Sequence, residues 1–138
     1  MIPDIRLAIV VNPALPLGLI ANTVGAIAIG IGARVPALGA IRLVDVDGNA
    51  IDISSNLPVP ILQATPEVIS ALTLKAMARA DDATAVVFPA FARALHDYRD
   101  YEAKFPTIRL AEETVDGIGI AGPAKWVKSL TGSLKLLR

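Results

Sequence analysis

The stretch IRLAIVVNPALPLGLIANT (residues 5–23) combines a strand, a loop and the beginning of a helix. Residues 5–11 are almost entirely apolar and rich in β-branched side chains, which is typical of a strand buried on both faces. Asn12-Pro13 and Pro16 then predict an irregular loop, and a helix is expected from Gly18 to about residue 32. The stretch therefore predicts a buried strand leading directly into a helix, as in α/β folds.

An uncharged run of 27 residues separates Arg6 from Arg34 and raises the question of a membrane segment. A membrane-spanning helix needs about 20 apolar residues without interruption. The prolines and Gly18 leave a helical part of roughly 22 Å at 1.5 Å per residue, which is too short. A signal peptide also matches poorly, because Asp4 offsets Arg6 and prolines interrupt the apolar region. We therefore expect a soluble, cytoplasmic protein without a membrane partner.

The rest of the chain alternates strands and helices. The segment IRLVDVDGNAIDI (41–53) predicts a hairpin that turns at Asp47-Gly48. Thr65 and Pro66 predict the start of a helix that reaches about Ala80. Further strands are expected near residues 58–64, 84–88 and 117–121, and further helices at 89–104 and between Pro123 and Gly132. The alternation predicts one domain over residues 1–138 with three layers, a mixed, mostly four-stranded sheet and helices on both faces.

The first predicted helix carries a stripe of small residues. Ala21, Gly25, Ala28 and Gly32 follow one another at intervals of four, three and four residues, so they share one side of the helix. Small side chains let the helix backbone approach a neighbour closely. The simpler interpretation is tight packing of this side on the sheet, and the alternative is a helix–helix seam between two copies of the chain.

Composition limits the classes of function. Thirteen basic and thirteen acidic side chains cancel, so no overall field attracts nucleic acid or anionic lipid. The absence of cysteine excludes disulfides, thiol nucleophiles and thiolate metal sites, and is consistent with the cytosol. Asp45 and Asp47 suggest a magnesium site, but turn formation explains both more simply. No metal and no cofactor is predicted.

The apolar content predicts self-association. Hydrophobic residues make up 54% of the chain and charged residues 19%, so a small domain leaves apolar surface exposed. We expect a symmetric homodimer, the commonest closed oligomer. The predicted helix near residues 90–104 offers Phe91, Leu95, Tyr98 and Tyr101 for its seam, although helical spacing also allows these side chains to pack internally.

Two motifs suggest chemistry that their surroundings do not support. DGIGIAGPAK (116–125) contains G-x-G-x-x-G, but a dinucleotide site needs a strand before the glycines and an acidic residue about 20 positions later. Here the glycines lie inside the predicted strand and the chain ends sixteen residues after Gly122. His96 is the single histidine and a candidate general base. No nucleophile is identifiable beside it, so an exposed helix face is the simpler explanation.

The C-terminal segment is basic. No acidic residue follows Asp116, whereas Lys125, Lys128, Lys135 and Arg138 are cationic. The helix start after Gly122-Pro123 adds free N–H groups that attract anions. These residues predict an anion- or RNA-binding surface, with solubility of a surface helix as the alternative.

Two stretches resemble the type II peptidyl-tRNA hydrolases. That family opens with an Ile-Val-Val strand, a Leu-x-Met loop and Gly-Lys-x-Ala-Ala-Gln, to which IVV, Leu15-Pro16-Leu17, Gly18 and Ile20-Ala21-Asn22 are similar. It closes with Gly-Pro-x-x-x-Ile-x-Lys-Val-Thr-Gly-x-Leu-Lys-Leu, which GPAKWVKSLTGSLKL (122–136) resembles almost position for position. The chain is more similar still to a bacterial branch known as domain-of-unknown-function family 2000.

The resemblance implies a peptidyl-tRNA hydrolase II-like fold but not its activity. Leu19 and Ala26 stand where the family has a catalytic lysine and a histidine, and the family's Asp-Ala-Gly-x-Thr segment has no counterpart. A leucine neither binds phosphate nor polarises an ester. The favoured hypothesis is therefore a non-hydrolytic protein that binds a small polar ligand.

The predicted ligand site is the loop and helix entry after the first strand, because ligands of α/β sheets gather beyond strand C-terminal ends. Its candidate residues are Asn12, Gly18, Leu19, Asn22 and Thr23. The two asparagines either bind the ligand or fix the loop. The alternative function is a divergent hydrolase of an RNA-linked ester that uses Lys125, Lys128 and Lys135 as its RNA-binding surface.

Overall fold

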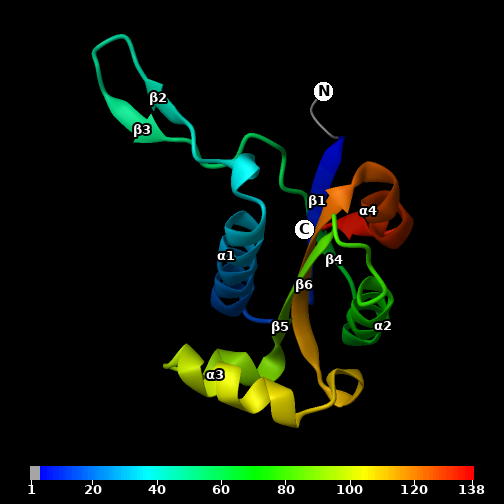
Figure 1. The fold of residues 1–138 in the computed structure, drawn as a ribbon. Coiled ribbons are helices and arrows are strands. Elements are labelled where there is room, and N and C mark those ends of the chain that lie inside the picture. Colours follow the sequence, from blue (N-terminus) through cyan, green and yellow to red (C-terminus); the bar gives the residue numbers. More distant parts are fainter. Residues whose placement is uncertain (1–3) are drawn as a thin grey trace.

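The computed structural model describes residues 4–138, and its main sheet has five strands. They lie in the order β5-β6-β1-β4-β7 (Figure 1). β1 runs parallel to β4, and the other neighbours are antiparallel. The bounds are β1 (Ile5–Val11), β4 (Ile61–Gln63), β5 (Thr84–Pro89), β6 (Val115–Pro123) and β7 (Lys135–Leu136). The four predicted strands and the mixed sheet are confirmed, and the short β7 is an addition to them.

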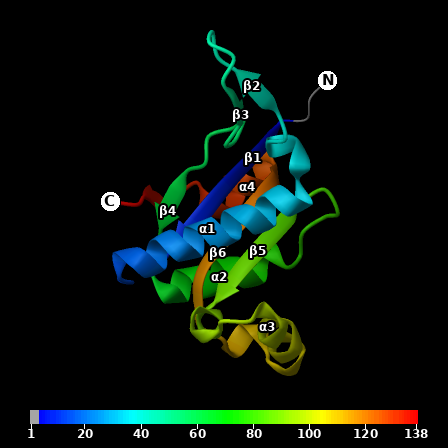
Figure 2. The ribbon, with the colours of Figure 1, turned by 90° about the vertical axis from the view of Figure 1, so that its left-hand side faces the viewer.

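Helices cover both faces of the sheet, as predicted (Figure 2). α1 (Leu17–Arg34) lies on one face, and α2 (Pro66–Ala76) and α4 (Ala124–Thr131) lie on the other. The apolar side chains of β1 pack on both faces of the sheet. Leu7, Ile9 and Val11 belong to the core under α1, and Ala8 and Val10 belong to the core under α2 and α4.

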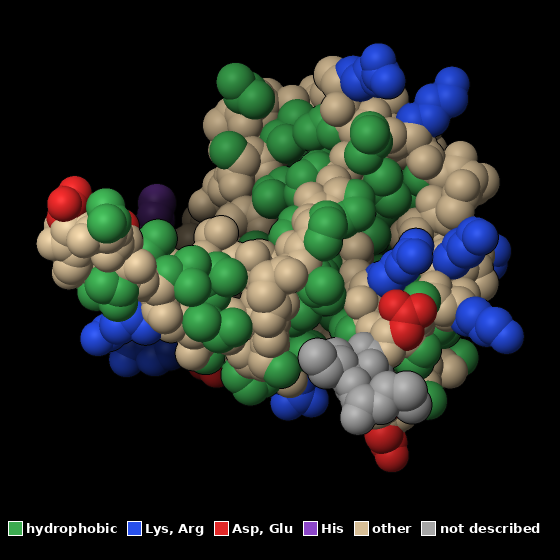
Figure 3. All heavy atoms as spheres, turned by 90° about the horizontal axis from the view of Figure 1, so that it is seen from above, with side chains coloured by type: hydrophobic (Ala, Val, Ile, Leu, Met, Phe, Trp, Pro, Cys, Tyr) green, Lys and Arg blue, Asp and Glu red, His purple; other side chains and the backbone are tan. Residues whose placement is uncertain are grey.

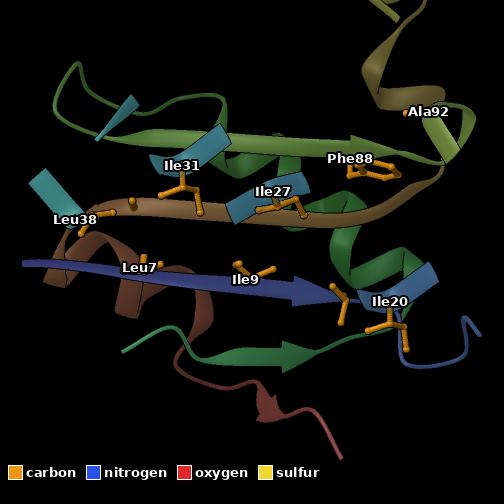
Figure 4. Packing of buried hydrophobic residues seen from close by; sticks show 10 residues of the cluster. Leu7, Ile9, Ile20, Ile27, Ile31, Leu38, Phe88 and Ala92 are labelled. Atoms are coloured by element: carbon orange, nitrogen blue, oxygen red, sulfur yellow. The ribbon is translucent and has the colours of Figure 1, made fainter. Parts of the chain in front are cut away.

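The side of α1 that faces the sheet differs from the predicted one. Its buried residues are Ile20, Thr23, Ile27 and Ile31, and Figure 4 shows Ile27 and Ile31 lying over β6. The small-residue stripe of Ala21, Gly25, Ala28 and Gly32 is exposed instead, so its packing against the sheet was a wrong prediction.

Glycines on β6, together with Gly30 on the helix, allow the close approach of α1. A Cβ atom at Gly30 would lie 2.8 Å from Cγ1 of Val86 on β5. A Cβ atom at Gly119 would lie 2.3 Å from Cγ2 of Ile27 and 2.7 Å from Cδ1 of Ile31. A Cβ at Gly117 would lie 2.9 Å from Cγ2 of Thr23. The two β6 glycines belong to the G-x-G-x-x-G motif, so its role here is helix–sheet packing inside a strand.

α1 is long and apolar enough, by length and composition alone, to cross a membrane. Ile20, Ile27 and Ile31 nevertheless pack on the sheet of a globular domain.

The predicted helix over residues 89–104 is interrupted. A 3-10 helix, η2 (Ala90–Ala94), follows β5, and α3 (Tyr98–Lys104) begins only after an extended Leu95. Asp97 accounts for the new start, because its side chain accepts the N–H of Arg99 and caps α3. Two 3-10 turns, η3 (Phe105–Thr107) and η4 (Leu110–Glu112), complete the connection to β6.

The predicted hairpin projects from the body of the molecule (Figure 1). We call residues 41–53 the arm, which contains β2 (Arg42–Val44) and β3 (Ala50–Asp52). Gly48 takes a φ of 86° in the turn. The Asp45 carboxylate accepts hydrogen bonds from the side-chain amide of Asn49 and from the backbone N–H groups of Asn49 and Asp47. These bonds, the Asn49 side chain first, hold the pKa of Asp45 below its usual value. Turn formation thus accounts for the Asp45 carboxylate.

Candidate functional site

The end of α1 nearest the arm borders a cleft of about 530 Å³. The turn η1 (Pro36–Leu38), the base of the arm and the segment before β4 complete its walls. The volume falls within the range of about 300–1,000 Å³ that is usual for small-molecule sites. The lining residues are Leu7, Ala28, Ile31, Gly32, Pro36, Leu38, Gly39, Ala40, Ile53, Ser54, Ser55 and Val59.

Hydrogen bonds fix the walls of this cleft. Asn56 donates its side-chain amide to the carbonyl of Ala37 at 2.7 Å and its backbone N–H to that of Leu38 at 2.9 Å. The hydroxyl of Ser55 donates to the carbonyl of Leu57 at 2.7 Å. These bonds tie the segment after the arm to η1, so the two walls keep a defined separation.

The lining combines apolar walls with a few polar groups. Leu7, Ile31 and Leu38 are buried at its base, and Ser54 and Ser55 supply hydroxyls. Ala40 has a φ of 64°, in the left-handed region that is uncommon for a residue with a side chain. Strained backbone of this kind is concentrated at functional sites, where the surrounding structure holds it.

The residues predicted for ligand binding lie at the opposite end of α1. Asn12 accepts the N–H of Ala14 with its side-chain oxygen at 3.0 Å, and this bond fixes the loop. Gly18 and Asn22 are exposed, Leu19 is partly buried, and Thr23 is buried. The structure thus divides this group between the loop, the surface and the core, and their role in ligand binding stays a prediction.

An ion pair beside Asn12 was not predicted from the sequence. Arg93 donates from Nε and Nη2 to the two carboxylate oxygens of Asp116 at 2.8 and 2.9 Å. The Asp116 side chain is 2% exposed and that of Arg93 is 36% exposed. The backbone N–H of Asn12 donates to the Asp116 carbonyl at 3.2 Å. The ion pair therefore joins η2 to the start of β6, and the backbone hydrogen bond joins the loop after β1 to the same residue.

A β-bulge directs the Asp116 side chain. Phe88 pairs with Gly117 and Pro89 with Val115, so Asp116 has no partner on β5. Bulges of this kind re-aim a side chain and often occur near functional sites. In the sequence, the only indication was an acidic residue at the beginning of an apolar strand.

The residues proposed for a dimer seam pack mainly within the chain. Phe91 and Tyr101 meet edge to face, with ring centroids 5.5 Å apart, and both are partly buried. The Tyr101 hydroxyl donates to the carbonyl of Val87 at 3.1 Å, and burial raises the pKa of Tyr101. Leu95 is also partly buried, and Tyr98 is 49% exposed. His96 is exposed in the linker between η2 and α3.

The predicted basic surface is distributed over α4 and β7. Lys125, Lys128 and Lys135 are all exposed, and Figure 3 shows several Lys and Arg side chains on the side of the molecule opposite the arm. Lys128 and Arg6 line one shallow cavity of about 240 Å³. The first N–H of α4, from Ala124, is already bound to the carbonyl of Asp4.

Over residues 4–138, no group of three or more metal-ligating side chains comes together. The prediction that the protein uses no metal or cofactor stays a prediction.

Comparison with known proteins places the chain in a family. The model of a family described as protein of unknown function (DUF2000) matches residues 5–138. The chain belongs to the DUF2000 family. A solved structure of a protein of unknown function from Agrobacterium tumefaciens strain C58 superimposes with a TM-score of 0.88 over 98% of each chain. At 18% sequence identity, this likeness shows a shared fold. No curated protein matches the chain in sequence.

Proposed function

We propose that this DUF2000 protein binds a small molecule in the cleft between α1, η1 and the base of the arm. The observation that carries the proposal is a cleft of about 530 Å³ with apolar walls, hydrogen-bonded edges and hydroxyls at its rim. Small-molecule sites share this combination of apolar lining and a few placed polar groups.

The lining specifies the chemistry of the ligand. Every lining residue is uncharged, so a charged ligand would lose hydration without gaining a partner of opposite charge. An apolar body would replace water along Ile31, Leu38 and Val59, and one polar group would hydrogen-bond to Ser54, Ser55 or the backbone near Ala40. The small polar ligand expected from the sequence thus becomes a mostly apolar molecule with one or two polar atoms.

Binding is favoured over catalysis at this cleft. A serine nucleophile needs an adjacent base, and the lining contains hydroxyls but no histidine, lysine or carboxylate. Ser55 already donates its hydroxyl to the chain itself. We therefore propose a binding protein; its location in the cytoplasm is a proposal that rests on the sequence alone.

Filling the cleft tests this function. 2-Naphthol, an aromatic body with one hydroxyl, should shift the backbone amide resonances of the lining residues in ¹⁵N–¹H spectra. Val59→Trp should abolish these shifts, because Val59 lines the cleft and its larger replacement occupies the ligand volume. Val68→Trp is the matched control, since Val68 is 43% exposed on α2, on the other face of the sheet. Equal shifts in the two variants would refute the proposal.

A divergent peptidyl-tRNA hydrolase is the second candidate. It is supported by the sequence resemblance and by the two cationic residues Arg6 and Lys128, which line the same cavity. Turnover of peptidyl-tRNA by the unmodified protein would favour it over a binding function. Leu19→Lys introduces the lysine that the type II peptidyl-tRNA hydrolases have at the matching position. It should raise turnover if the hydrolytic site is otherwise intact. RNA binding by the basic residues should weaken steeply with salt.

A further inference from the structure

The arm exposes an apolar surface that its own chain does not cover. Residues 41–52 are all exposed. Its apolar side chains retain large exposed fractions: Ile41 45%, Leu43 45%, Val44 64%, Val46 98% and Ile51 61%. Among the described residues 4–138, β2 and β3 pair only with each other. A two-stranded hairpin alone is marginally stable in water, so an arm of this composition calls for a partner surface.

The outer side of α1 is a second uncovered apolar surface. Leu17 is 81% exposed and Ile29 76% exposed, and the small-residue stripe lies between them on the surface. A Cβ atom at Gly25 or Gly32 would meet nothing within 4 Å. The helix carries no charge before Arg34. A partner can therefore approach the backbone of α1 closely without desolvating a charged group.

Both surfaces lie on the same side of the molecule. Figure 1 shows the arm extending past the end of α1, on the side away from the sheet, and Figure 3 shows hydrophobic side chains along the arm and over the adjoining body. On the arm, Nε of Arg42 lies 3.6 Å from Oδ1 of Asp52, so the charges of these two side chains offset each other. The remaining arm charges, Asp45 and Asp47, lie at its turn. One apolar partner surface can thus meet the arm and α1 together.

We infer that this surface is the seam of a symmetric homodimer, in which α1 packs antiparallel against α1 of a second copy and each arm lies over the partner. The small-residue stripe has intervals of four, three and four, which are the same in both directions along the helix. An antiparallel pair with its twofold axis between Gly25 and Ala28 places each Ala21 beside the Gly32 of the other copy. A twofold interface requires self-complementarity of this kind.

The available surface approaches the size of a stable dimer interface. Twelve arm residues (41–52) and ten exposed residues of α1 are at most 22 residues on each copy, because only one side of the hairpin can face a given partner surface. A standard interface uses about 20–30 residues from each partner and buries roughly 800 Å² on each. The inference does not rest on the proposed ligand, but Ala28 and Gly32 also line the cleft, so the second copy would border it.

Sedimentation equilibrium tests the dimer and its seam. The unmodified protein should have twice the chain mass of 14.4 kDa at micromolar concentration. Gly25→Glu should return the mass to 14.4 kDa, because it places two carboxylates at the centre of the seam. The variant should fold normally, since the site is open. Val44→Glu on the arm should raise the dissociation constant at least tenfold. Val68→Glu on α2, on the other face of the sheet, is the control and should leave the dimer intact.

Disulfide trapping tests the antiparallel register, because the chain has no cysteine of its own. A mixture of Ala21→Cys and Gly32→Cys chains should form a covalent dimer readily under mild oxidation. A mixture of Ala21→Cys and Ser129→Cys chains should not, since Ser129 is exposed on α4, across the sheet.

Several results would overturn the inference. They are a concentration-independent mass of 14.4 kDa for the unmodified protein, a dimer that survives Gly25→Glu, and equal trapping in the two cysteine mixtures. A monomer that sediments with phosphatidylcholine vesicles would also overturn it, because the apolar surface would then face lipid.

Discussion

The close contact between Gly119 and α1 makes a quantitative prediction about stability. In Gly119→Ala, the new Cβ would lie 2.3 Å from Cγ2 of Ile27 and 2.7 Å from Cδ1 of Ile31. Unstrained carbon atoms approach to about 3.5–4.0 Å, so the helix or the strand must move by roughly 1 Å. Both contacts lie in the core, where Ile27 is 0% and Ile31 2% exposed, so neither side chain can move into solvent.

Two effects of opposite sign set the magnitude for Gly119→Ala. Replacing a strand glycine by alanine stabilises by roughly 0.5–1 kcal/mol when space is available. Overpacking of a core costs about 1–3 kcal/mol, and the 2.3 Å contact places this site at the upper end of that range. The net loss should be about 2 kcal/mol, which corresponds to a fall in Tm of roughly 6–10 °C for a domain of this size.

Urea and thermal unfolding, followed by circular dichroism, measure this loss. Gly18→Ala is the matched control, because a Cβ there meets nothing within 4 Å, and it should be neutral or up to about 1 kcal/mol stabilising. In the double variant Gly119→Ala with Ile27→Ala, the two losses should be less than additive by about 1 kcal/mol, since the second change removes the shorter of the two contacts and leaves the one with Ile31. Gly119→Ala at or above the stability of the unmodified protein would refute the assignment of Gly119 to helix packing.

Three further changes test other parts of the structure. Arg93→Met should destabilise by about 2–4 kcal/mol in urea unfolding because it leaves the Asp116 carboxylate buried without its partner, and Arg93→Met with Asp116→Leu should recover much of this loss. The pKa of Tyr101 is raised above its usual 10.0, so the folded state holds that proton more tightly. This stabilisation is complete at lower pH and should be lost as pH rises above 10.0. The Tyr101→Phe variant should not show this loss when its free energy of unfolding is measured against pH. Gly48→Ala should cost about 1–2 kcal/mol in the arm turn, because its φ is 86°, and amide hydrogen exchange should accelerate in the arm but not in the sheet.

The sequence by itself determined the elements whose cause is local. β1 follows from a continuous apolar run, and the arm follows from alternating residues around Asp47-Gly48. The start of α2 follows from Thr65, which accepts the N–H of Val68, and Pro66 at the first helical position. In each case the decisive interaction joins residues a few positions apart, so the pattern contains the information.

Only the tertiary structure decided which side of α1 faces the sheet. The helix is apolar almost all round, so no polar side opposes a buried one and the pattern does not choose. The choice depends on Gly117 and Gly119, about 90 residues away, which provide space for the isoleucines of α1. The same reason explains β7, whose two residues form a strand because they pair with β4.

Some of the candidate sites could likewise be predicted from the sequence, and others are formed only by tertiary packing. The loop after β1 and the basic C-terminal helix could be found from composition and fold rules. The cleft is lined by three separate segments, within residues 28–40, at 53–55 and at Val59, together with Leu7 of β1. The Arg93–Asp116 pair joins residues 23 positions apart across a β-bulge. Packing brings these groups together over long sequence separations, and no local pattern records that proximity.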